Sequence, residues 1–154
     1  MNRGSFEKME DLRGRLGEEA GVSDWQDISP GRVRGFAEVT GDSQWIHLDS
    51  DRCVEESPFG VPVAHGYLTL SLFPILYAEA VEIRDPFRLV VNYGIDRLRF
   101  PAPVPVGSRI RLRLTPLSVD DIPDGVQVVW KATFEVEGNA KPACTAEIVF
   151  RYYR

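Results

Sequence analysis

Residues 67–83, YLTLSLFPILYAEAVEI, are long enough for a helix and apolar on nearly every side. A helix without a polar face is stable only when other structure surrounds it. The stretch is too short and too interrupted to cross a bilayer, which takes about 20 apolar residues. It therefore predicts a buried helix, in which Pro74 causes a kink or a local adjustment.

The second half of the chain has a hydrophobic period of two from residue 87 onward, which is typical of strands with one buried face. Such strands are predicted over residues 87–100, 109–114, 128–136 and 144–152, with a turn over 101–107. Asp124-Gly125 and Gly138-Asn139 predict further turns. Helices followed by about four antiparallel strands predict an α+β fold, in which the sheet curls around the apolar helix.

Two helices are predicted ahead of the apolar segment. Apolar residues recur at helical spacing over residues 5–17, which predicts a short amphipathic helix. In "ISPGRVRGFAEVTGD", Ser29 is a suitable N-cap and Pro30 suits the first helical position. Thr40-Gly41 ends this second helix, so we expect Asp42 just past its end and His47 on the loop that follows.

The segment "TGDSQWIHLDSD", residues 40–51, places His47 near Asp42. A carboxylate and an imidazole can hold one water, from which the carboxylate takes a proton while the imidazolium donates one. The alternative is that Asp42 only ends a helix and His47 lies on the surface. A metal site that adds Asp49 and Asp51 is disfavoured, because zinc sites use more His or Cys and the calcium-loop spacing is absent.

His65 and Gly66 precede the apolar helix. The start of a helix offers unpaired N–H groups, and glycine lets a ligand carbonyl come close to one of them. The Gly66 N–H could therefore stabilise a developing oxyanion. We interpret His65 as a residue that caps the helix or forms a local hydrogen bond. Ser71 is not predicted to be a nucleophile, since no G-x-S-x-G motif surrounds it.

Charge and cysteine usage exclude several classes of protein. The net charge is −5 and the basic residues are scattered among acids, so no nucleic-acid partner is expected. Cys53 and Cys144 form no C-x-x-C motif, which favours packing roles and a reduced, cytoplasmic setting. The charged N-terminus lacks the apolar core of a signal peptide, and no membrane partner is expected.

Three blocks of sequence, "FAEVTGDSQWIHLD", "PFGVPVAHGYLTLSL" and "RFPAPVPVGSRIR", resemble the MaoC-like (R)-specific enoyl-CoA hydratases in order and spacing. "NYGIDRLRFPAPVPVGSR" and "EGNAKPAC" are similar to the NodN-like subgroup. The resemblance implies a hotdog fold, an antiparallel sheet wrapped around a long central helix, here from about Gly66 to Ala80. It implies one MaoC-like hotdog domain over residues 1–154, with a helical N-terminal extension over 1–20. It also implies a homodimer joined edge to edge through the two sheets.

The resemblance further implies an activity and a set of site residues. Asp42 and His47 match the catalytic dyad, and Gly66 matches the glycine whose N–H faces the thioester oxygen. The remaining substrate-binding candidates are Gln44, Tyr67 and Asn92. The implied reaction is reversible syn addition of water to a trans-2-enoyl thioester, giving the (R)-3-hydroxyacyl thioester. The thioester carrier is coenzyme A or an acyl carrier protein, and no metal or redox cofactor is expected.

The chain departs from the family pattern in two places. The broader family often has Asn-Pro between its Asp and His, whereas this chain has Gln44-Trp45, a longer amide and more bulk near the acyl path. Pro74 stands where some relatives carry serine. Two other functions stay open, a non-catalytic acyl-thioester-binding protein and a hotdog thioesterase, because a fold does not dictate an activity.

Overall fold

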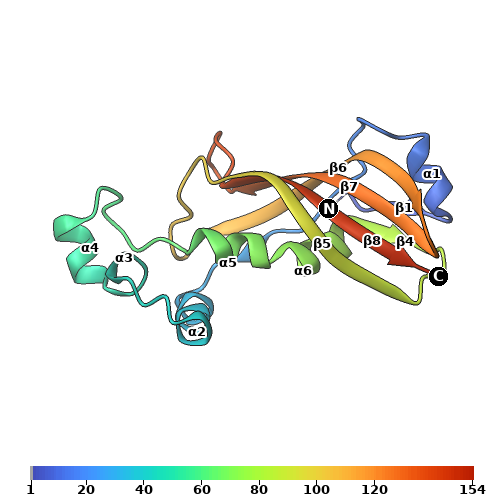
Figure 1. Ribbon diagram of the computed structural model, residues 1–154. Helices are drawn as coiled ribbons and strands as arrows, with labels where there is room; N and C mark the ends of the chain where they lie inside the picture. Colours follow the sequence, from blue (N-terminus) through green and yellow to red (C-terminus); the bar gives the residue numbers. More distant parts are fainter. Residues whose placement is uncertain (1) are drawn as a thin grey trace.

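The computed structural model describes residues 2–154, and its main element is a sheet of six antiparallel strands (Figure 1). The strand order is β2-β6-β7-β8-β5, with β3 also paired to β6. The strands are β2 (Gly21–Val22), β3 (Gln26–Asp27), β5 (Leu89–Arg99), β6 (Arg109–Ile122), β7 (Gly125–Val136) and β8 (Cys144–Tyr153). A separate parallel pair is formed by β1 (Gly4–Phe6) and β4 (Val81–Ile83).

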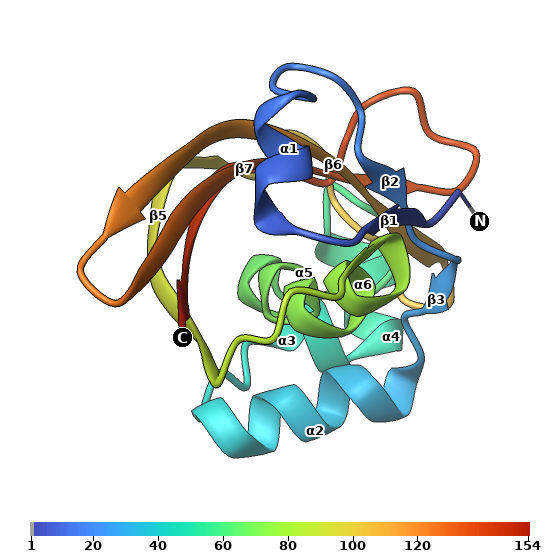
Figure 2. The same ribbon diagram turned by 90° about the vertical axis from the view of Figure 1, so that its right-hand side faces the viewer.

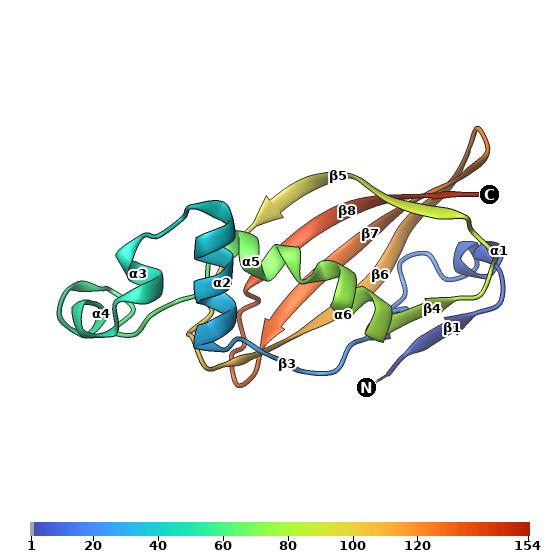
Figure 3. The same cartoon turned by 90° about the horizontal axis from the view of Figure 1, so that it is seen from below.

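The helices occupy the concave face of the sheet and both of its ends (Figure 3). They are α1 (Met9–Arg13), α2 (Pro30–Thr40), α3 (Trp45–Leu48), α4 (Ser50–Glu56), α5 (Gly66–Ser71) and α6 (Phe73–Ala80). The sheet curves around α5 and α6, and α2 lies on the far side of these two helices (Figure 2). The helices α2, α3 and α4 gather at one end of the molecule, beside the start of α5 (Figure 3). Within residues 2–154, no helix is both long enough and apolar enough to traverse a bilayer.

The helices α5 and α6 together form the predicted central helix, with a break at Leu72. Pro74 is the second residue of α6, where the missing N–H removes no intrahelical hydrogen bond. The inner face of α6 packs on the sheet, and Phe73 meets Phe150 edge to face with ring centroids 5.1 Å apart. The predicted α+β hotdog arrangement, a sheet wrapped around a central helix, is confirmed.

The long strands have the predicted period of two. On β6, Ile110, Leu112 and Leu114 are fully buried beneath the helices. The residues between them face outward, where Arg111 Nε lies 2.6 Å from a carboxylate oxygen of Glu135 on the neighbouring strand β7. The alternation therefore separates an apolar core from a charged outer face.

The turn between β6 and β7 lies one residue earlier than predicted. Asp124 takes the left-handed backbone conformation, with φ of 58°, and Gly125 is already the first residue of β7. A Cβ atom at Gly125 would lie 2.2 Å from the carbonyl oxygen of Tyr152, so close strand approach requires glycine there. The second predicted turn is confirmed, because Gly138 has φ of 75° and the Asn139 N–H donates to the carbonyl oxygen of Val136, the last residue of β7, at 3.0 Å.

The N-terminal segment differs from the helix predicted over residues 5–17. Residues Gly4–Phe6 form strand β1 instead, because their backbone pairs with β4. The helix α1 covers only Met9–Arg13 and starts where the Asp11 carboxylate accepts a hydrogen bond from the Lys8 N–H at 2.9 Å. Met9 and Leu12 are fully buried in the main core. The helical spacing therefore correctly indicated burial of Met9 and Leu12 but not of Leu16, which is 45% exposed, and it did not give the length of the helix.

Candidate active site

Asp42 lies directly past the end of α2, as predicted. Ser29 begins this helix by accepting a hydrogen bond from the Arg32 N–H at 3.2 Å. Gly41 ends it in the left-handed conformation, with φ of 76°, and donates its N–H to the Ala37 carbonyl oxygen at 2.8 Å. The chain therefore leaves the helix at a fixed point, and Asp42 is exposed at that point.

His47 lies in the one-turn helix α3, and the prediction of a loop here was wrong. Two hydrogen bonds to the backbone of Val63 hold this short helix in place. The His47 Nδ1 is 2.6 Å from the Val63 carbonyl oxygen, and the Val63 N–H donates to the Ile46 carbonyl oxygen at 3.0 Å. A carbonyl can only accept, so Nδ1 carries the hydrogen. The neutral His47 ring therefore presents Nε2 as an acceptor.

Burial lowers the pKa of His47 below its ordinary value of 6.5. Loss of solvation is the largest cause, because the residue is only 9% exposed. The hydrogen bond to Val63 and the charge of Asp42 act in the opposite direction, and His65 lowers the pKa further. At neutral pH the ring is therefore uncharged, and Nε2 can accept a hydrogen bond from a water.

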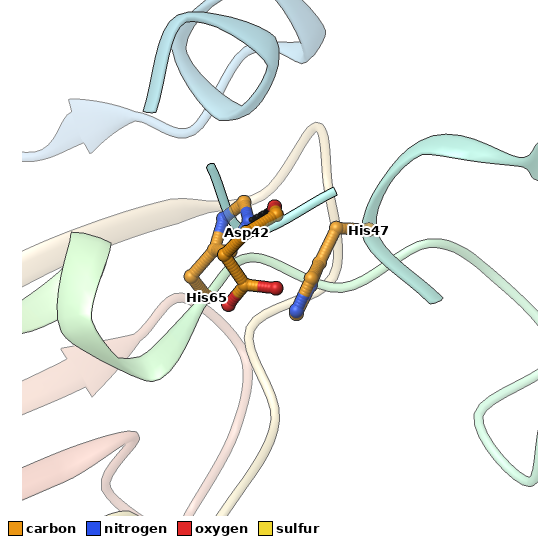
Figure 4. A group of neighbouring side chains, drawn as sticks. All are labelled: Asp42, His47 and His65. Carbon is orange, nitrogen blue, oxygen red and sulfur yellow. Dashed lines mark hydrogen bonds between the residues drawn. The ribbon is translucent and has the colours of Figure 1, made fainter. Parts of the chain in front are cut away.

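His65 also belongs to this group, which the sequence interpretation missed. Its ring is stacked on His47 with centroids 3.8 Å apart. Its Nε2 donates to the backbone carbonyl oxygen of Asp42 at 2.9 Å. His65 is the N-cap residue of α5, as predicted, but its side chain forms no capping hydrogen bond. Figure 4 shows Asp42, His47 and His65 converging, and one ligand-type atom from each lies within 4.8 Å of the others. Within residues 2–154, these three residues are the group that could hold a cation, and the group does not include Asp49 or Asp51, whose metal site was disfavoured from the sequence.

A surface hollow of about 230 Å³ joins this group to the start of α5. Four of the six candidate residues line it: Asp42, His47, Gly66 and Tyr67. Gly66 is the first residue of α5, so its N–H has no acceptor within the helix. A Cβ atom there would lie 3.2 Å from the Phe100 ring, a close contact that glycine avoids.

A second hollow of about 350 Å³ adjoins the first and shares His47, Gly66 and Phe100 with it. Its other lining residues are mostly apolar, among them Ile46, Phe59 and Val104. The two hollows place polar groups able to hold water and a carbonyl oxygen beside an apolar surface. Such an arrangement suits a ligand with one polar, reactive end and one apolar portion.

Two candidate residues lie elsewhere. Gln44 is the exposed N-cap residue of α3, and its N–H is 3.5 Å from the Asp42 carboxylate. Asn92 lies on β5 and lines a different hollow of about 410 Å³, beside Pro74, which does not include Asp42 or His47. Trp45 does not line the two hollows at His47, because its ring packs beneath the Arg52 guanidinium at 4.3 Å. The Trp45 side chain, which was predicted to add bulk near the acyl path, therefore lies outside both hollows.

Other assignments from the sequence are confirmed. The Ser71 hydroxyl donates to the Tyr67 carbonyl oxygen at 2.6 Å, as expected for a helical serine without a catalytic partner. Cys53 and Cys144 are free thiols buried in the fold. Asp49 caps α4 by accepting from the Arg52 N–H at 3.0 Å, so its carboxylate has a structural partner.

Comparison with known proteins places this geometry in one family. The profile of the MaoC like domain matches residues 11–137. The chain is 46% identical over 149 residues to 3-hydroxyacyl-thioester dehydratase Z of Mycobacterium tuberculosis strain H37Rv, covering 96% of this chain and 97% of that protein. It is 39% identical over 139 residues to nodulation protein N of Rhizobium leguminosarum bv. viciae, covering 88% of this chain and 85% of the relative.

The fold is also similar to solved structures of MaoC-like proteins. The MaoC-like dehydratase from Rhodospirillum rubrum superposes with a TM-score of 0.75 at 20% identity, covering 96% of this chain and 97% of that one. The chain therefore has this hotdog fold, with Asp42 and His47 beside the start of its central helix. The chain belongs to the MaoC-like domain family.

Proposed function

We propose that this protein is a hydro-lyase that acts on acyl thioesters, an (R)-specific enoyl-CoA hydratase or 3-hydroxyacyl-thioester dehydratase. One observation carries the proposal: Asp42 and His47 converge on one hollow beside the free N–H of Gly66. The names of the relatives, a 3-hydroxyacyl-thioester dehydratase and a MaoC-like dehydratase, support the same reaction class.

In the proposed mechanism, one water lies between the Asp42 carboxylate and His47 Nε2. Asp42 takes a proton from this water as the oxygen bonds to C3 of the enoyl chain, while the neutral imidazole accepts the second hydrogen bond. The proton then passes from the Asp42–His47 pair to C2 on the same face, which restores both residues. The Gly66 N–H stabilises the enolate oxygen of the thioester between these steps. The net change is addition of one water across the double bond, and the reverse sequence is the dehydration.

The direct test is hydration of crotonyl-CoA, followed by loss of the absorbance of its conjugated double bond. We expect turnover and an (R)-3-hydroxy product, identified by chiral chromatography. Longer enoyl thioesters and an acyl carrier protein thioester identify the preferred chain and carrier. Release of free thiol without hydration would instead show a thioesterase, and binding without turnover would show a non-catalytic protein.

The lowered pKa of His47 predicts the pH dependence. Because the neutral ring is the reactive form, kcat/KM should fall as pH decreases and should reach half of its plateau value below pH 6.5. An NMR titration of His47, assigned with a His65 variant, should give a midpoint below 6.5. A midpoint above 6.5 would contradict both the burial argument and the proposed role of a neutral ring.

We also propose a homodimer formed through β5. Among the described residues, β5 pairs on one side only, with β8, and it is the last strand of the sheet. Tyr93 and Ile95 on this strand are 56% and 45% exposed. A long apolar strand edge can form hydrogen bonds with another strand. In a two-fold symmetric dimer, that strand is β5 of the second copy.

Replacement of Ile95 by lysine should convert a dimer into a monomer, because a two-fold axis brings a like charge from each copy to the interface. Light scattering coupled to size exclusion measures the mass of each variant. Val54→Lys is the matched control, since Val54 is 71% exposed on α4, away from β5. A wild-type protein that is monomeric at all concentrations would refute the dimer.

The remaining parts of the proposal concern cofactors, domain limits and location. The proposed mechanism uses only Asp42, His47, the Gly66 N–H and water, so it needs neither a metal nor a redox cofactor. We further propose that residues 1–154 are one domain. Burial of Met9 and Leu12 in the main core supports this limit. We place the protein in the cytoplasm, which two free buried thiols support.

A further inference from the structure

Three elements that form the site meet at the ring of His65, which is 2% exposed. Phe36 of α2 lies on it with ring centroids 4.9 Å apart, and His47 of α3 is stacked on it at 3.8 Å. The backbone of Asp42, between these helices, accepts its Nε2–H. His65 also directly precedes Gly66 in the chain. His65 is therefore in contact with Asp42 and His47 and adjacent in the chain to Gly66, the three residues of the proposed reaction.

Asp42 needs such support because its other attachments are weak. The Asp42 N–H is 3.4 Å from the Thr40 hydroxyl, and its carboxylate is 3.5 Å from the Gln44 N–H. Both distances are at the limit of a hydrogen bond, whereas the bond from His65 is 2.9 Å long. Asp42 is also exposed, so packing does not fix it. The bond from His65 is thus the strongest of the three.

The hydrogen positions on His65 follow from its partners. The Asp42 carbonyl only accepts, so Nε2 carries the hydrogen. The other ring nitrogen, Nδ1, is buried and has no hydrogen-bond partner within residues 2–154. A proton on Nδ1 would be a buried donor without an acceptor, which costs free energy. The surroundings of the ring therefore favour the tautomer that donates from Nε2 alone.

We infer that His65 is a positioning residue, which holds Asp42 and His47 in one reactive arrangement by donating Nε2–H to the Asp42 backbone while stacking on His47. This inference rests on the proposed function for its kinetic consequences. It does not make His65 a catalytic residue, because the ring acts through its two neighbours. A small misplacement of reacting groups can lower a rate by about 10²-fold, so the effect on catalysis is measurable.

Two substitutions separate the hydrogen bond from the stacking. His65→Gln keeps an N–H the same number of bonds from the backbone as Nε2, so it can still donate to Asp42. His65→Phe keeps an aromatic ring between Phe36 and His47 but cannot donate. We expect His65→Phe to lower kcat by roughly 10- to 100-fold with little change in KM, and His65→Gln to retain more activity. Thermal unfolding should show that both variants fold.

A spectroscopic readout is independent of turnover. The chain has two histidines, so each ¹⁵N-imidazole signal can be assigned with one single-histidine variant. We expect His65 to be the Nε2–H tautomer, with slow exchange of that hydrogen, and His65→Gln, which loses the stacked ring, to shift the His47 signals more than His65→Phe does. A Nδ1–H tautomer, or wild-type kcat in folded His65→Phe, would overturn the inference. Because the NMR result does not depend on an enoyl thioester, failure of the proposed function is a separate outcome.

Discussion

Asp42→Asn should lower kcat for crotonyl-CoA hydration by roughly 10²–10⁴-fold, the usual contribution of a general acid–base group. The asparagine amide has the size of the carboxylate but cannot take a proton from water. His47→Asn should have a loss of the same order. Its amide nitrogen is as many bonds from the backbone as Nδ1 and can still donate to Val63, whereas the acceptor at Nε2 is gone. Initial rates of absorbance loss measure both effects.

The double variant should be little worse than either single one, because residues that share one water act as a unit. Stability is the control. Asp42 is exposed, so Asp42→Asn should change the free energy of unfolding by less than about 0.5 kcal/mol. Wild-type turnover in folded Asp42→Asn would remove this residue from the mechanism, whatever the activity of the protein.

The fold could be predicted because its main signals are periodic and local. The alternation on β6, the Ser29-Pro30 helix start and the Thr40-Gly41 helix stop are all found in the structure. Residues 5 and 6 were wrongly predicted as helical because their conformation depends on pairing with β4, far along the chain. The spacing of apolar residues along the sequence gives no information about pairing with a distant strand.

The site was only partly predictable for a related reason. Asp42, His47 and Gly66 could be found from a helix stop, a helix start and a family resemblance. The role of His65 depends on a backbone carbonyl 23 residues away, which no local pattern encodes. The His65-Gly66 pair ahead of the apolar helix was the available signal. Asn92 lines a different hollow from His47 because β5 spans much of the sheet, and its position along a strand could not be derived from the sequence.

Trp130→Ala should lower the free energy of unfolding by about 3–5 kcal/mol, the usual cost of truncating a fully buried aromatic side chain. Trp130 packs edge to face against Tyr77 of α6, with ring centroids 5.6 Å apart, so it joins β7 to the central helix. Its Nε1–H donates to the Tyr152 hydroxyl at 3.2 Å, and that hydroxyl is 2.7 Å from the Tyr77 hydroxyl. Urea unfolding, fitted with a common slope, measures the loss.

Trp130→Phe separates the contribution of apolar packing from that of the hydrogen bond to Tyr152. Phenylalanine restores much of the apolar volume but cannot donate to Tyr152, so a smaller loss of about 1–3 kcal/mol is expected. Burial raises the pKa of Tyr152 to about 12, so its hydroxyl stays protonated and the result should not depend on pH between 6 and 9. Trp130 contacts α6, whereas the site lies at the start of α5. Folded Trp130→Phe should therefore keep wild-type kcat at low temperature, the reverse of Asp42→Asn, and a large fall in its kcat would show that the core and the site are coupled through the central helix.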